Sequence, residues 1–225
     1  MSAWRVATAL LRKDLLAEWR TKDVSTAIFL FGLTIAVSFA FAFEPTPDEA
    51  RVIAGGLLWL GFLFSAVLGL NRGFARETAN NCLEALRLAP ADPGSLYLGK
   101  LLSNVLLLLA AELVLLPVFG LFFNLALWER PGWLLLILLL GTWGVAALGT
   151  LFSAVSANTR MQELMLPLLL LPLTVPVLVA AVDLTTILLF DRPMSEGALQ
   201  FRLLAGFDII FTLLCWLLFG YVLEE

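Results

Sequence analysis

The chain has 225 residues, of which 61% are hydrophobic and 14% are charged, and its formal net charge is -4. This composition excludes a separate soluble catalytic domain, because too few polar residues remain to cover one. Histidine is absent. Its absence excludes histidine metal sites, Ser/His/Asp triads and axial ligation of haem by a histidine of this chain.

Six long apolar segments dominate the sequence. A helix needs about 20 residues to cross the roughly 30 Å hydrocarbon core of a bilayer. The segments are continuous and do not alternate with a period of two, which favours helices over a barrel. The sequence therefore predicts an all-α polytopic membrane protein, with one transmembrane domain over residues 1–225 and six transmembrane helices. The predicted spans lie near 24–43, 52–70, 98–123, 133–155, 164–182 and 204–222.

An amphipathic helix is predicted before the first span, over residues 3–20. Its apolar stripe consists of Trp4, Ala7, Leu11, Leu15 and Trp19 at helical spacing. This pattern is typical of a helix in the cytoplasmic membrane interface. Three other apolar residues fall outside the stripe, so partial burial against protein is the alternative. The first span itself is expected to be a retained helix and not a removed signal peptide, because no small-residue cleavage site precedes it.

The connection between the second and third spans is longer and more polar than a turn requires. Small and apolar residues recur there at helical spacing, with charges of both signs between them. We predict a short amphipathic helix over residues 74–88. Its mixed charge favours a protein partner, since an anionic membrane surface would select for bases alone.

The distribution of Lys and Arg predicts the orientation of the chain. If the amino terminus is cytoplasmic, ten of the 14 cations fall on the cytoplasmic side and four on the other side. This bias predicts that both termini are cytoplasmic and that the number of spans is even. The ten are Arg5, Arg12, Lys13, Arg20, Lys22, Arg72, Arg76, Arg87, Lys100 and Arg160, and the four are Arg51, Arg130, Arg192 and Arg202.

The segment from Gly94 to Leu101 resembles a phosphate-binding loop in all but its last position. Such a loop follows a strand and ends in a hydroxyl that holds Mg²⁺. Leu101 has no hydroxyl, no strand is predicted upstream, and a membrane helix follows. We therefore expect no nucleotide site here. We interpret Lys100 as a residue that marks the cytoplasmic end of the third span.

Glu112 lies near the middle of the third span. An ionisable side chain at that depth costs about 2.5 kcal/mol or more on insertion scales, so it should have a partner and face protein or water. Two interpretations stay open. Glu112 lines a substrate path or relays protons, or it is a neutral or hydrogen-bonded group inside the bundle, paired with Asn104 of the same helix or with a residue of another span.

The fifth predicted span contains three prolines, Pro167, Pro172 and Pro176. Each proline removes an intrahelical hydrogen bond, so the helix should kink or break. Kinked helices move or line substrate paths in some transporters, although proline is also common in membrane helices. We take Pro172, Thr174 and Pro176, together with Glu112, as the candidate functional residues inside the membrane.

Glycines are concentrated in the second and fourth predicted spans. Small residues let two helices approach closely. They favour either a tight bundle or a dimer seam, and the sequence does not distinguish the two.

Taken together, these features resemble the permease subunit of type-2 ABC exporters, and more closely the haem exporter protein B (CcmB) family of cytochrome c maturation. The resemblance covers nearly the whole chain. It is most specific from Phe74 to Pro90, with Gly99 and Lys100 following, and from Leu171 to Pro176. It implies that residues 74–88 form a coupling helix that docks on a separate ABC ATPase. The implied contacts are Arg76, Glu77, Leu83, Glu84, Leu86 and Arg87.

The resemblance also implies a complex in the bacterial inner membrane. ABC machines pair two membrane halves with two ATPase halves, so a homodimer is expected. The implied partners are a CcmA-like ABC ATPase, a CcmC-like haem-handling membrane subunit, a small single-span CcmD-like subunit and a CcmE-like haem chaperone, with no nucleic acid. The chain would be a non-catalytic subunit that couples ATP hydrolysis to haem delivery or to release of the haem-loaded chaperone. It would bind no cofactor directly, with ATP in the ATPase and haem in the partner subunits.

Two other functions are kept as alternatives. A type-2 ABC permease for a lipid, polysaccharide or drug would share the bundle and the coupling helix. A proton-coupled carrier or an intramembrane enzyme would be built around Glu112. An ABC ATPase partner would support the first two functions, and haem-handling partners would single out cytochrome c maturation.

Overall fold

The structure is a computed structural model that describes residues 3–42, 47–79, 92–157 and 162–224. These residues form helices joined by short connections, and the described ranges contain no strand. The fold is therefore all-α, as predicted. The helices are α1 (Ala3–Thr21), α2 (Asp23–Ala42), α3 (Pro47–Ala79), α5 (Pro93–Phe122), α6 (Pro131–Ala157), α7 (Gln162–Leu189) and α8 (Ala198–Glu224), with a short 3₁₀ helix η1 (Met194–Gly197) before α8.

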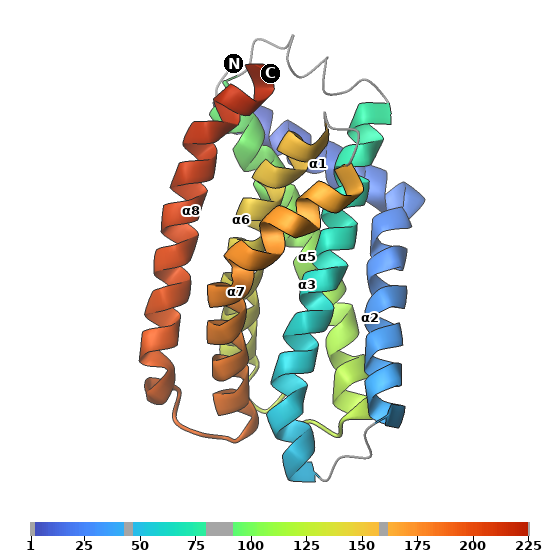
Figure 1. The fold of residues 1–225 in the computed structure, drawn as a ribbon, viewed down its shortest axis with the longest axis vertical. Helices are drawn as coiled ribbons and strands as arrows, with labels where there is room; N and C mark the ends of the chain where they lie inside the picture. Colours follow the sequence, from blue (N-terminus) through green and yellow to red (C-terminus); the bar gives the residue numbers. More distant parts are fainter. Residues whose placement is uncertain (1–2, 43–46, 80–91, 158–161, 225) are drawn as a thin grey trace.

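Six of these helices, α2, α3 and α5 to α8, are long and apolar enough to cross a membrane. They stand side by side as a bundle, and both chain termini lie at the same end of it (Figure 1). This end is called the terminal end below, and the other end is called the far end. The six predicted spans are confirmed, and the shared position of the termini agrees with an even number of crossings.

Several spans extend beyond the predicted limits: α3 does so at both ends, α5 and α8 begin earlier, and α7 ends later. α5 starts at Pro93, because Pro suits the first helical position and the Asp92 side chain accepts a 3.1 Å hydrogen bond from the Ser95 N–H. α7 continues past Asp183, whose side chain is exposed on the helix surface. The connection between the last two spans is therefore shorter than the span limits predicted, and it contains η1.

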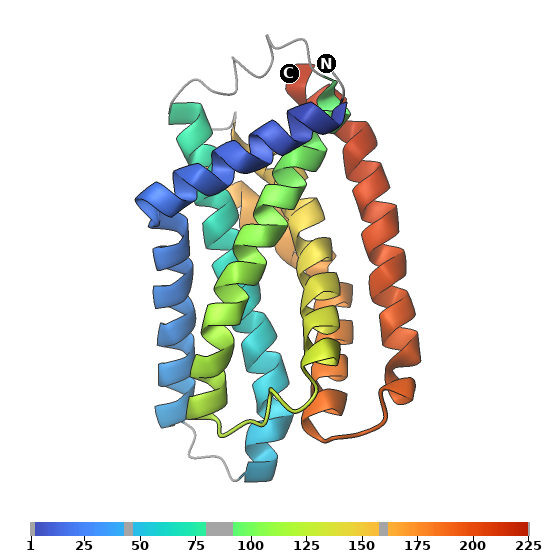
Figure 2. The same cartoon turned by 180° about the vertical axis from the view of Figure 1, so that it is seen from behind.

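Helix α1 lies across the terminal end of α5 (Figure 2). Ala7 and Leu10 are buried at this crossing, and Gly99 of α5 permits it, since a Cβ there would lie 3.0 Å from the Ala7 carbonyl oxygen. Trp4 and Trp19 are 69% and 79% exposed. The amphipathic helix is confirmed, but the two tryptophans are not on the face that packs on protein. They point outward, where an indole suits a membrane interface.

A buried carboxylate connects α1 to the start of α2. The Glu18 side chain accepts hydrogen bonds from the Ser25 N–H at 2.7 Å and from the Ser25 hydroxyl at 2.8 Å. Helix amino termini carry unpaired N–H groups and favour negative charge. Glu18 of α1 therefore caps the next helix and fixes the angle between the two.

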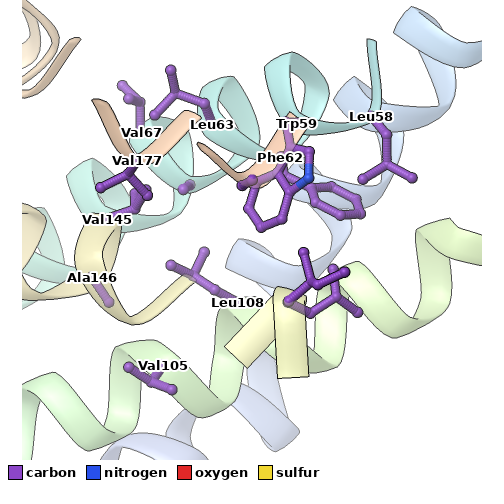
Figure 3. Packing of buried hydrophobic residues seen from close by; sticks show 14 of the residues in the cluster. Leu58, Trp59, Phe62, Leu63, Val67, Val105, Leu108, Val145, Ala146 and Val177 are labelled. Atoms are coloured by element: carbon purple, nitrogen blue, oxygen red, sulfur yellow. The ribbon is translucent and has the colours of Figure 1, made fainter. Parts of the chain in front are cut away.

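The centre of the bundle is built around Trp59 of α3. Its indole is 2% exposed and lies among side chains of α3, α5, α6 and α7, including Phe62, Leu108 and Val177 (Figure 3). The indole N–H donates a 2.8 Å hydrogen bond to the Thr185 hydroxyl of α7. A buried indole needs such an acceptor, so this bond fixes α3 against α7.

Glycines of the second and fourth spans allow close packing within the bundle. A Cβ at Gly141 would lie 2.1 Å from the Trp59 ring, one at Gly149 would lie 2.3 Å from Leu70, and one at Gly69 would lie 2.8 Å from Ile28. These contacts are within the chain. At these three positions, the tight-bundle interpretation of the glycines is therefore the correct one.

Two loops meet at the far end. Arg130, before α6, forms an ion pair with Asp191 and donates a 2.9 Å hydrogen bond to the Arg192 carbonyl oxygen. Arg192 in turn pairs with Glu196 of η1. The connection from α5 to α6 is thereby tied to the connection from α7 to α8.

Candidate functional site

Glu112 is enclosed between α5 and α6. It is 6% exposed, and the Thr142 hydroxyl lies 2.7 Å from both of its carboxyl oxygens. A hydroxyl carries one proton, so it donates to one carboxyl oxygen at a time. The hydrogen-bond partner of Glu112 is therefore in another span. It is not Asn104 of the same helix, whose amide donates to Thr150 of α6 at 2.9 Å.

A small cavity adjoins Glu112 and Thr142. Its volume is about 10 Å³, and its walls are otherwise apolar, with Trp59 and Phe62 of α3 and Leu178 of α7 among them. This volume is at the lower limit for one water molecule. The cavity therefore holds no bulky substrate, and it gives the carboxyl little contact with water.

The proline-rich part of α7 lies elsewhere. α7 is assigned as one helix with Pro167, Pro172 and Pro176 inside it, and its two halves run in different directions (Figure 1). The predicted kink is confirmed, without a break. The Thr174 hydroxyl is buried and donates to the Leu170 carbonyl oxygen at 3.0 Å. None of Pro172, Thr174 and Pro176 lines the cavity at Glu112, so the four candidate residues do not form one site.

A second carboxyl inside a span was not singled out from the sequence. Asp208 of α8 is 7% exposed, and neither of its oxygens has a hydrogen-bond partner among the described residues. It fits only because α6 has a glycine there, since a Cβ at Gly144 would lie 2.8 Å from one Asp208 oxygen. The signal was available, because an acid within the apolar run 204–222 is the same anomaly as Glu112.

Lys100 connects α5 to α1 near the terminal end. Its ammonium lies 2.8 Å from an Asp14 carboxylate oxygen, and the two side chains are 9% and 16% exposed. The string from Gly94 to Leu101 is helical throughout, which agrees with the expectation that it is no phosphate loop. Lys100 therefore holds the amphipathic helix on the bundle.

We predict that Lys100→Met weakens the attachment of α1, because it leaves the Asp14 carboxylate without this partner in a poorly hydrated place. The expected loss is about 1–3 kcal/mol in the free energy of unfolding, with faster proteolysis within residues 3–21 in detergent. Lys13→Met is the matched control, since Lys13 is 47% exposed and lies 3.3 Å from the same carboxylate. Equal proteolysis of the two variants would contradict the assignment.

The implied ATPase contacts are only partly within the described residues. Arg76 and Glu77 belong to the last turns of α3, which runs without interruption from the span through residue 79. Leu83, Glu84, Leu86 and Arg87 lie outside the described residues. The prediction of a coupling helix over residues 74–88 thus stays a prediction.

The described part of the chain gives no indication of a metal site. Within the described ranges, no group of three or more His, Cys, Asp and Glu side chains could hold a metal ion. The other residues that line the cavities beside Glu112 and Asp208 have apolar, aromatic or hydroxyl side chains.

The fold and its buried polar contacts define a multi-pass, all-α membrane protein. The family model of the CcmB protein matches residues 5–223, and the chain belongs to this family. The chain is similar to three bacterial proteins named heme exporter protein B. The relative from Paracoccus denitrificans is 34% identical over 171 residues, which are 76% of this chain and 78% of the relative. The relative from Rhodobacter capsulatus is 32% identical over 178 residues (78% and 80%), and that from Bradyrhizobium diazoefficiens is 28% identical over 203 residues (90% of each).

Proposed function

We propose that the chain is the membrane subunit of an ABC-type complex in cytochrome c maturation. In this complex, ATP hydrolysis by a separate CcmA-like ATPase is coupled to haem delivery or to release of a haem-loaded CcmE-like chaperone. The chain acts as a homodimer with CcmC-like and CcmD-like subunits, in the bacterial inner membrane with both termini in the cytoplasm. The observation that carries the proposal is the family match over nearly the whole six-span chain.

The shape of α3 supports a role in coupling. This helix has 33 residues, which at 1.5 Å per residue is about 50 Å. It carries Trp59 in the centre of the bundle and ends at Ala79, inside the segment predicted to meet the ATPase. Because α3 is one continuous helix, it gives a direct connection through which a displacement at the ATPase would reach Trp59. Trp59 is in turn bonded to Thr185 of the kinked α7.

The terminal end also supports the orientation. α1, the end of α3 and the start of α5 lie together there (Figures 1 and 2). This end carries most of the chain's Lys and Arg residues, and in membrane proteins the side rich in cations is cytoplasmic. The ATPase works on cytoplasmic ATP, so it would dock at this end.

The test is affinity purification of the chain from its native membrane in mild detergent, with the partners identified by mass spectrometry. An ABC ATPase together with haem-handling subunits is the expected result. An ATPase with none of the haem-handling subunits would favour export of a lipid, polysaccharide or drug. Absence of any ATPase would overturn the proposal.

A charge reversal locates the ATPase surface. We expect Glu84→Arg to lower co-purification of the ATPase about tenfold, because a like charge opposite a basic partner residue opposes docking. Glu129→Arg is the matched control, since Glu129 is exposed in the loop before α6 at the far end. Unchanged co-purification and maturation in Glu84→Arg, with the bundle intact, would count against residues 74–88 as the docking surface.

A further inference from the structure

A groove runs between α7 and α8 on the outer surface of the bundle. Its volume is about 260 Å³. One wall is α7 at Pro176 and Val177, within the proline-rich part, and the other wall is α8 from Arg202 to Phe211. All the lining side chains except Arg202 are apolar, so the groove suits a hydrocarbon chain.

Arg202 is the polar end of the groove. It is exposed, and among the described residues it has no acidic side chain as a partner. It lies four residues after the start of α8, which is about 6 Å into the helix from the far end. This depth is within reach of lipid headgroups for a long side chain that extends toward the interface.

The groove continues inward along one face of α8. Gly206 and Ile210 follow Arg202 at intervals of four residues, so they lie below it on the same face. A Cβ at Gly206 would meet nothing within 4 Å. The floor of the groove is therefore open there, and the glycine is not required by close packing within the chain.

We propose that this groove binds an anionic phospholipid, with the lipid phosphate at Arg202 and an acyl chain over Gly206 and Ile210. The match is one of charge and shape. Arg donates paired hydrogen bonds to a phosphate, and the remaining lining is apolar over about 12 Å of helix, from Arg202 to Ile210. A transmembrane helix of a partner would leave the unpaired guanidinium inside a protein contact, which is costly unless an acid meets it.

The bound lipid would contact α7 at Pro176, where the kinked helix lacks a backbone N–H. It would fill the gap between α7 and α8 and so fix the position of the kink. This inference does not rest on the proposed function, because it needs only the groove and a bilayer.

Native mass spectrometry of the purified full chain in detergent tests the site. The probes are phosphatidylglycerol and phosphatidylcholine of the same chain length, titrated separately. We expect phosphatidylglycerol to bind about tenfold more tightly, because its phosphate charge is not offset, whereas phosphatidylcholine also carries an ammonium that the Arg202 guanidinium repels. Arg202→Gln should abolish this preference, while Arg192→Gln should keep it, since Arg192 is paired with Glu196 in the neighbouring loop.

A second variant tests the groove separately from the charge. Gly206→Leu places a side chain into the open floor and should lower binding of both lipids at least fivefold. Gly132→Leu, at another glycine whose Cβ would meet nothing within 4 Å, should bind as the unchanged chain does. Three results would overturn the proposal: a preference for phosphatidylglycerol that survives Arg202→Gln, full binding in Gly206→Leu, or Arg202-dependent displacement of the lipid by haemin, which would assign the groove to a porphyrin carboxylate.

Discussion

Thr142→Val is expected to destabilise the protein by about 1–3 kcal/mol, because it leaves the Glu112 carboxyl buried without its hydrogen-bond partner. Valine keeps the shape of threonine, so packing is nearly unchanged and the lost hydroxyl accounts for the effect. The measurement is thermal or denaturant unfolding of the purified chain in detergent.

A double substitution tests whether the lost hydrogen bond, and not a change in packing, causes the loss of stability. Removing both partners of a buried hydrogen bond costs less than removing one. We therefore expect Glu112→Met combined with Thr142→Val to recover most of the stability lost in Thr142→Val alone. If the double variant is less stable than Thr142→Val, the carboxyl has another stabilising role.

Glu112→Gln distinguishes a structural carboxyl from a proton-carrying one. Glutamine keeps an oxygen that accepts from the Thr142 hydroxyl but cannot exchange a proton as a carboxyl does. We expect cytochrome c maturation within about twofold of the unchanged protein, because the cavity beside Glu112, about 10 Å³, is too small to hold a substrate. Loss of maturation in a stable Glu112→Gln variant with ATPase binding intact would instead favour the alternative of a proton-coupled carrier or intramembrane enzyme built around Glu112.

The spans could be predicted because length and apolar composition are local properties of the sequence. The burial of Glu112 followed from the same property, since a charge in an apolar run must face protein or water. Its partner could not be predicted, because Thr142 is 30 residues away and reaches Glu112 only through the packing of α5 on α6. Asp208 could have been predicted as a buried acid, and it was not.

The face of α1 shows another limit of sequence periodicity. Tryptophan is apolar enough to suggest a protein core and amphipathic enough to prefer a membrane interface. Trp4 and Trp19 point outward, as residues of a membrane interface do. Ala7, Leu10 and Asp14 face α5 instead. Ala7 and Asp14 lie on the packed face because they meet Gly99 and Lys100 of α5. These partners are 85 or more residues later in the chain, so the periodicity of α1 does not reveal them.

Gly141→Ala is expected to lower the free energy of unfolding by about 1–3 kcal/mol, the usual cost of overpacking. The added Cβ would lie 2.1 Å from Cη2 and 2.5 Å from Cζ3 of Trp59. The indole is rigid, and its N–H is held by Thr185. It also meets the Phe62 ring edge to face, with the centroids 5.9 Å apart. The ring therefore cannot move without breaking its hydrogen bond to α7 and its contact with the Phe62 ring.

Gly132→Ala is the control in the same helix, since a Cβ there would meet nothing within 4 Å. It should leave stability unchanged or raise it by less than about 1 kcal/mol, because alanine favours a helix over glycine. Trp59→Phe is the compensating change, since the smaller ring lacks the far atoms of the indole. We expect the double variant Gly141→Ala and Trp59→Phe to be more stable than the sum of the single effects predicts. Strict additivity would show that the alanine does not meet the indole, and would remove Trp59 as the link between α3, α6 and α7.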